Sequence, residues 1–214
     1  MIELELRNKA EIETGARSCI YSLIAQGFRF PNQTAYEAVA SGRFKASIDE
    51  AAANLPYSFS PVGRWGEGMA LNPQEFEVEY IQHFDVGGPQ GAPCSLYEGE
   101  AEGGRMKTME DLIRCYEHFD LRLATRARER PDHLAIEMEY MHYLAFKEAD
   151  SHARGRDSAP YRQAQFDCLK VHLVDFANRV AGRIGALNAP FYSDLVQGAK
   201  AFCNCEFAYL GESV

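Results

Sequence analysis

The sequence lacks the features that direct a chain into or across a membrane. Residues 1–6, Met-Ile-Glu-Leu-Glu-Leu, are acidic where a secretory signal carries Lys or Arg followed by an apolar run. No stretch approaches the roughly 18 consecutive apolar residues of a membrane-spanning helix. We therefore expect a cytoplasmic protein with no membrane partner.

Cysteines at redox or metal-site spacing are also missing. None of the six cysteines belongs to a CxxC pair, and Cys203-x-Cys205 by itself is too little for a zinc or iron–sulfur site. In a reducing compartment such scattered cysteines are free thiols, several of them buried as small apolar residues. We expect this for the whole set: Cys19, Cys94, Cys115, Cys168, Cys203 and Cys205.

Local signatures of catalysis are absent. There is no GxSxG segment, and Cys94 has no neighbouring residues that would activate it as a nucleophile. The glycines of residues 56–72 are followed by no Lys-Ser or Lys-Thr and flanked by no strand, so they do not form a phosphate-binding loop. The sequence therefore predicts that the protein is not an enzyme and carries no cofactor.

Positive charge is in the minority. The chain has 22 basic and 31 acidic residues, and its net charge of −9 repels nucleic acid and favours a basic partner. One basic cluster contains Arg122, Arg126, Arg128 and Arg130, with Glu129 inside it. We interpret it as a solvated helix end, where cations interact favourably with the helix dipole.

Alternating strand patterns are absent, and helical spacing runs through nearly the whole chain. The first helix places Ile12, Ala16, Cys19, Ile20 and Leu23 on one face. Further helices are expected over residues 44–55, 132–149, 161–184 and 190–209, and Gly and Pro gather between helices in residues 56–72 and 85–107. The prediction is an all-α, single-domain bundle of about eight helices spanning residues 1–214, with long Gly/Pro-rich loops.

Several helix starts are marked by capping residues. Either Asn32 or Thr34 is suited to begin a short second helix, and residues 72–75, Asn-Pro-Gln-Glu, form a strong start. Thr108 is the expected start of a fifth helix. Aromatic residues then recur at four-residue spacing after residue 75, and we interpret this stripe as core packing: Phe76, Tyr80 and Phe84.

A metal site is the alternative reading of the helix over residues 132–149. Glu139 and His142 form one ExxH pair, and His133 and Glu137 lie one turn apart. Di-iron helical bundles use two ExxH pairs and two further glutamates, and this chain has one such pair. A helical metal-binding protein or enzyme using these four residues is therefore the second hypothesis.

Three segments combine aromatic and acidic residues without a catalytic pattern. They are the aromatic stripe, the loop from Pro93 to Glu102, and the start of the helix at Asp132 and His133. A groove with aromatic walls and acidic edges suits an apolar peptide with basic flanks, because arginine pairs bidentately with carboxylates. Peptide binding is therefore compatible with these residues.

The same segments resemble the TorD/DmsD/NarJ family of redox-enzyme maturation chaperones. Residues 79–84 are similar to the family's E-Y-x-x-x-F helix, residues 93–98 to its P-x-x-x-Y-E loop, and residues 131–137 to its P-D-H-[LI]-x-x-E segment. Phe191, Tyr192 and Leu195 are similar to its F-Y-x-x-L. The form of residues 94–100, Cys-Ser-Leu-Tyr-Glu-Gly-Glu, further resembles the branch serving type II enzymes of the dimethyl-sulfoxide-reductase family.

This resemblance implies a cytoplasmic, system-specific chaperone. Such a protein binds the twin-arginine leader or the body of a molybdenum-containing catalytic subunit, assists cofactor insertion and delays export until folding is complete. The sequence leaves the oligomeric state open between a monomer and a domain-swapped dimer, since the long loops would allow helices to exchange between protomers. Carried over by position, the peptide-binding residues are Tyr97, Asp132 and His133, followed by Glu98 and Glu137. We expect Asp132 to pair with a leader arginine, to cap the following helix, or to do both.

Overall fold

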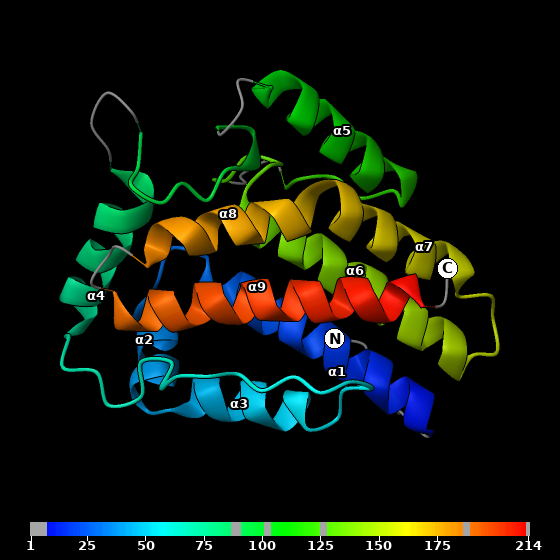
Figure 1. Ribbon diagram of the computed structural model, residues 1–214, viewed down its shortest axis with the longest axis horizontal. Coiled ribbons are helices and arrows are strands. Elements are labelled where there is room, and N and C mark those ends of the chain that lie inside the picture. The colour runs from blue at the N-terminus through cyan, green and yellow to red at the C-terminus, as the bar shows by residue number, and fades with distance from the viewer. Residues whose placement is uncertain (1–7, 87–90, 101–103, 125–127, 186–188, 213–214) are drawn as a thin grey trace.

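The computed structural model describes residues 8–86, 91–100, 104–124, 128–185 and 189–212 (Figure 1). The α-helices are α1 (Lys9–Gly27), α2 (Gln33–Ala40), α3 (Arg43–Ala52), α4 (Pro73–Tyr80), α5 (Arg105–His118), α6 (Leu134–Ala153), α7 (Ala159–Cys168), α8 (Val174–Ile184) and α9 (Pro190–Gly211). π-Helical turns follow α4 at Ile81–Asp85 and join α7 to α8 at Leu169–Leu173. A 3-10 turn covers Glu98–Glu100.

The predicted all-α fold is confirmed. Across the described ranges there is no β-strand, and Tyr97 pairs with His133 in an isolated antiparallel bridge. α7 and α8 continue one another through the π-helical turn, as the prediction of one long helix over 161–184 required. With that pair taken as one rod, the described helices agree with the expected number of about eight.

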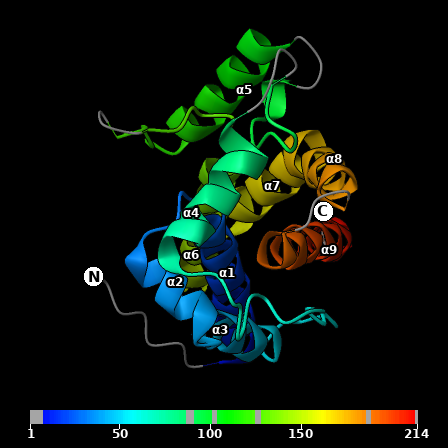
Figure 2. The ribbon, with the colours of Figure 1, turned by 90° about the vertical axis from the view of Figure 1, so that its left-hand side faces the viewer.

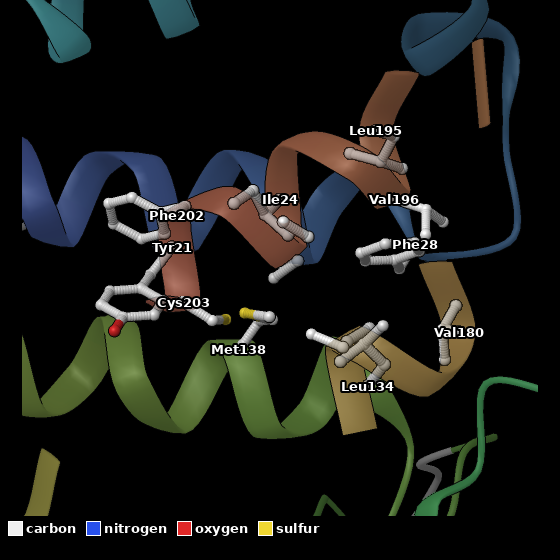
Figure 3. Close-up of a cluster of buried hydrophobic side chains, with 14 of the residues drawn as sticks. Tyr21, Ile24, Phe28, Leu134, Met138, Val180, Leu195, Val196, Phe202 and Cys203 are labelled. Atoms are coloured by element: carbon white, nitrogen blue, oxygen red, sulfur yellow. The ribbon is translucent and has the colours of Figure 1, made fainter. Parts of the chain in front are cut away.

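The core lies where four helices meet. α1 packs along α6, and α9 packs along α8. Figure 3 shows their buried side chains in contact, among them Tyr21 and Ile24 from α1, Met138 from α6 and Phe202 from α9. Figures 1 and 2 both place α5 at the periphery of this bundle. α5 buries only Leu112 and Tyr116.

The predicted apolar face of the first helix is partly wrong. Ile12 and Cys19 are exposed, whereas Ile20, Tyr21 and Ile24 are fully buried. α1 contacts α6, α3 and α9, so the buried surface is set by these neighbours and is rotated from the one that spacing alone suggested. All six cysteines are free thiols, as predicted, and Cys94, Cys168 and Cys203 are buried.

Helix boundaries agree where capping chemistry is complete. Asn72 and Glu75 form a reciprocal capping box at α4, and Asn32 rather than Thr34 caps α2. α5 begins at Arg105, one turn before the predicted start, and the Thr108 hydroxyl donates to the Gly104 carbonyl within that helix. The error arose because α5 starts at a glycine that offers no side-chain cap.

Two further expectations about helix ends are corrected. α6 is capped by His133, so the alternative role of Asp132 as the cap is wrong. α5 ends at His118, so Arg122, Arg128 and Arg130 lie in the segment beyond the helix rather than at its end. Arg126, the remaining member of that cluster, lies outside the described residues.

Candidate functional site

Two of the motif segments lie against each other and form what we call the junction, residues 94–100 and 129–134. The Glu98 N–H donates to the Asp132 carbonyl, and the Leu134 N–H donates to the Leu96 carbonyl, each over 2.9 Å. Between these bonds the rings of Tyr97 and His133 meet edge to face, with centroids 4.9 Å apart. Backbone pairing therefore brings together residues separated by more than thirty positions in sequence.

The junction is anchored in the core and tightly packed at one glycine. Cys94 and Leu96 are buried and hold the loop down. A Cβ at Gly99 would lie 2.8 Å from the Arg105 Cα and 3.2 Å from Asp132 Oδ2. Only glycine fits at this position without movement of the backbone at the start of α5.

Asp132 accepts hydrogen bonds inside the junction. Its carboxylate is fully buried, and the Gly99 N–H donates to Oδ2 over 3.3 Å. Arg130 Nε donates to Oδ1 over 3.0 Å, and Arg130 Nη2 donates to Oδ2 over 3.3 Å. Nη2 also donates to Glu100 over 3.1 Å, and the Arg130 guanidinium carbon stands 3.9 Å from the centre of the Tyr97 ring. A guanidinium group is thus held by two carboxylates and one aromatic face.

His133 is a neutral, buried helix cap. Its Nδ1 accepts a hydrogen bond from the Ala135 N–H over 3.1 Å, which satisfies one free donor at the start of α6. Burial lowers the pKa of His133 to about 4, against the opposing effect of the Glu129 carboxylate 3.9 Å from Nε2. The imidazole is therefore uncharged at neutral pH and acts here through hydrogen bonding and ring contact.

Glu98 and Glu137 lie on the inner side of the junction. Glu98 Oε2 is 3.0 Å from His172 Nδ1, which links the loop to the π-helical turn between α7 and α8. Glu137 is fully buried, and neither of its carboxylate oxygens has a hydrogen-bond partner in the part of the chain that the structure describes. Burial, together with the Glu98 and Asp132 carboxylates, raises the pKa of Glu137 well above its usual value.

The five predicted site residues thus lie in one place but at different depths. Tyr97 and Glu98 are partly exposed, whereas Asp132, His133 and Glu137 are buried. Sequence reasoning missed the other participants, which are Arg130, Glu100, Glu129 and His172. The order Arg-Pro-Asp at residues 130–132 was the available signal for Arg130, and no local pattern indicated His172.

The four residues of the metal alternative do not converge. His133 caps α6, Glu137 is buried without a polar partner, and Glu139 pairs with Arg29 at the surface. His142 Nδ1 lies 2.9 Å from the Ser18 hydroxyl oxygen. Within the described ranges, no group of three or more His, Cys, Asp or Glu side chains could hold a metal ion. The alternative is therefore not favoured.

A groove of about 890 Å³ adjoins the junction. Eight aromatic side chains contribute to its lining: Phe30, Phe44, Phe76, Tyr116, Tyr140, Tyr143, Phe191 and Tyr192. Its charged lining residues are Arg29, Arg122, Arg128, Glu129 and Glu139, of which Arg29 and Glu139 form an ion pair. Glu129 belongs to both groove and junction, because it accepts a 2.6 Å hydrogen bond from the Tyr97 hydroxyl.

The aromatic stripe is mainly core, as predicted. Phe76, Tyr80 and Phe84 are at most 2% exposed. The Tyr80 hydroxyl donates to the Phe28 carbonyl over 3.0 Å, and the rings of Phe76 and Tyr192 stack with centroids 5.3 Å apart. The aromatic stripe is therefore part of the core, and Phe76 also contributes to the lining of the groove.

Known proteins similar to this chain are assembly factors. The family model described as nitrate reductase delta subunit matches residues 41–181. A selenate reductase assembly chaperone protein of Thauera selenatis is 32% identical over 73% of this chain and 88% of its own length. A chlorate reductase assembly chaperone protein of Ideonella dechloratans is 38% identical over 52% of this chain and 60% of its own length.

A solved structure has a similar fold. It is described as a redox enzyme maturation protein from Archaeoglobus fulgidus, and it aligns with a TM-score of 0.54 over 95% of this chain and 99% of its own. At 17% identity this likeness concerns the fold alone.

The fold and these relatives define a helical maturation chaperone of the TorD/DmsD/NarJ type. The chain belongs to the nitrate reductase delta subunit family. The predictions of a system-specific chaperone and of a protein that is not an enzyme are confirmed by these relatives. Of the helices in the described ranges, none has the length and apolar character of a membrane span.

Proposed function

We propose that this protein is a cytoplasmic chaperone for the catalytic subunit of a type II molybdenum enzyme of the dimethyl-sulfoxide-reductase family. It binds the twin-arginine leader or the body of that subunit, assists cofactor insertion and delays export until the subunit has folded. Two relatives are named as assembly chaperones of selenate reductase and of chlorate reductase, and these names support this class of client. The whole chain acts as one domain, as a monomer or as a domain-swapped dimer.

The observation that carries the leader-binding proposal is the continuity between groove and junction. A leader places arginines before an apolar segment. The groove offers aromatic side chains to the apolar segment, and the junction offers carboxylates to the arginines. Tyr97 connects the two through its bond to Glu129. The net charge of −9 also attracts a basic leader.

The five site residues have different roles in this proposal. Tyr97 and Asp132 contact the leader arginine, one through its ring face and the other through its carboxylate. His133 positions them by fixing the start of α6, and Glu98 does so by fixing the loop to His172. Glu137 is buried beside the junction, where burial raises its pKa and favours the uncharged carboxyl group.

Calorimetric titration with leader peptides tests the proposal. The peptides are the leaders of selenate-reductase and chlorate-reductase catalytic subunits, each also made with Gln-Gln in place of Arg-Arg. We expect micromolar binding that Asp132→Asn weakens about tenfold, or 1.4 kcal/mol. Asp111→Asn, which alters a surface ion pair on α5, is the matched control. Absence of binding to every leader and to the whole apo-subunits would contradict the proposal.

A further inference from the structure

The most complete binding arrangement in the junction is already filled by a residue of the chain itself. Tyr97, Glu100 and Asp132, which we call the guanidinium clamp, surround the Arg130 side chain. They supply an aromatic face and two carboxylates, and Asp132 receives two nitrogens of one guanidinium fork. This geometry suits arginine and not lysine, because a planar guanidinium both stacks and donates bidentately.

Backbone and side-chain contacts that do not involve the Arg130 side chain help to hold Asp132 and Tyr97 in place. Asp132 is held in place by the Pro131–Leu134 backbone, which is bonded to the loop, and by the Gly99 N–H. The core contacts of Leu96 fix the backbone beside Tyr97, whose hydroxyl is bound to Glu129. Arg130 lies two residues before Asp132 in the same backbone segment, but a quarter of its side chain is exposed, whereas Asp132 is fully buried. Loss of Arg130 would leave a buried carboxylate with one long hydrogen bond, from Gly99, among the contacts described.

We propose that the guanidinium clamp is an arginine-binding site that Arg130 occupies from within, so that a partner's arginine binds by displacing Arg130. This inference rests on the proposed function, since it assigns the leader's arginine to the clamp. Displacement of Arg130 adds a regulatory element to the proposed function. The internal arginine competes with every ligand, so that only a peptide that also fills the aromatic groove displaces it.

The competition predicts in which direction the binding affinity and the stability change when Arg130 is removed. If the clamp is free in only a fraction of molecules, the apparent affinity for a partner arginine is reduced by that fraction. Removing Arg130 removes the competitor and leaves the buried Asp132 carboxylate without a counter-charge. A variant without Arg130 is therefore less stable alone, binds an arginine ligand more tightly, and gains more stability from it.

Peptide titration of Arg130 variants tests the competition. The probe is a synthetic peptide with two adjacent arginines followed by about 12 leucine and alanine residues, and a matched peptide has Gln-Gln instead. Arg130→Ala is expected to bind the Arg-Arg peptide at least about fivefold more tightly than the wild-type chain. This gain in affinity is expected to disappear when the Gln-Gln peptide is used. It should also disappear in the double variant that combines Arg130→Ala with Asp132→Asn. Arg114→Ala, on the surface of α5, is the control.

A second measurement does not depend on any leader. Millimolar guanidinium is expected to raise the thermal unfolding temperature of Arg130→Ala, while methylammonium at the same concentration does not. The wild-type chain and the double variant should show no such rise. If Arg130→Ala does not fold, Arg130→Met is used, because its side chain retains packing against Tyr97.

The outcomes separate the two proposals. If the wild-type chain binds the Arg-Arg peptide and a folded Arg130 variant binds it no more tightly, the competition is overturned. The proposed function would still stand. Absence of peptide binding in all variants, with guanidinium rescue intact, would retain the arginine site and count against leader binding. If guanidinium does not raise the thermal unfolding temperature of the Arg130 variant, the clamp is not an arginine-binding site.

Discussion

At the scale of single residues, the junction combines two groups whose ionisation is suppressed by burial. His133 stays neutral at pH 7 because burial lowers its pKa to about 4, and burial raises the pKa of Glu137 well above its usual value. The two have opposite effects on stability. Neutral His133 favours folding as pH rises from about 4, whereas Glu137 disfavours folding as pH rises above its ordinary value of 4.5.

We predict that Glu137→Gln stabilises the protein increasingly as pH rises above 4.5. Above pH 4.5 the unfolded chain loses the Glu137 proton and the folded chain keeps it, so the free energy of unfolding falls with pH. The free energy of unfolding of the variant does not fall in this way. The difference in this free energy between variant and wild type should therefore grow by about 1.4 kcal/mol per pH unit until the folded-state pKa of Glu137 is reached. Urea denaturation between pH 5 and 8 measures it. An equal, pH-dependent gain in Glu139→Gln, on the exposed side of α6, would refute burial as the cause.

At the scale of elements, one glycine lets a loop cross α9. Trp65, the single tryptophan, is fully buried in the loop between α3 and α4, and its backbone N–H donates to Asp194 over 2.9 Å. A Cβ at Gly198 would lie 2.4 Å from the Trp65 ring. The close approach of ring and helix therefore depends on the absence of a side chain at this position.

Two glycine-to-alanine changes should have opposite signs. Gly198→Ala is expected to lower the free energy of unfolding by about 1–3 kcal/mol, since overpacking exceeds the gain in helix propensity. Gly182→Ala in α8 has open space around the new Cβ and should raise it by up to about 1 kcal/mol. Thermal and urea unfolding measure both. A stabilised Gly198→Ala variant would show that the Trp65 contact is loose.

At the scale of the whole molecule, one buried ion network ties four helices together. Arg17 of α1 donates to Glu148 of α6 over 2.9 Å and to Glu206 of α9 over 2.7 Å. Gln165 of α7 bonds both Arg17 and Glu148. The Tyr57 hydroxyl adds a hydrogen bond to Glu206. The network specifies which faces of these helices meet, because any other packing would leave a buried charge without its partner.

Arg17→Met should therefore destabilise the whole molecule. It leaves Glu148 and Glu206 buried with less counter-charge, which costs about 3–5 kcal/mol, seen as a lower urea midpoint. A triple variant that also carries Glu148→Gln and Glu206→Gln should recover a large part of the loss. If the triple variant is as unstable as Arg17→Met, packing of the arginine rather than charge explains the effect.

Sequence patterns predicted the parts of the fold that depend on local chemistry. The capping box of Asn72 and Glu75 lies where it was expected, because its hydrogen bonds involve residues three positions apart. The start of α5 was misplaced because no side chain caps it. The face of α1 was misjudged because Arg17 is an unfavourable core residue until its partners on α6 and α9 are in place.

The sequence by itself determined the helical class of the fold, the order of the motifs and the residue types gathered at the candidate site. These follow from spacing and composition, which are properties of a chain segment. Only the tertiary structure decided that Arg130 fills the clamp, that Asp132 and Glu137 are buried, and that the aromatic groove adjoins Tyr97. Burial and ion pairing depend on which distant segments pack together, and no local pattern contains that information.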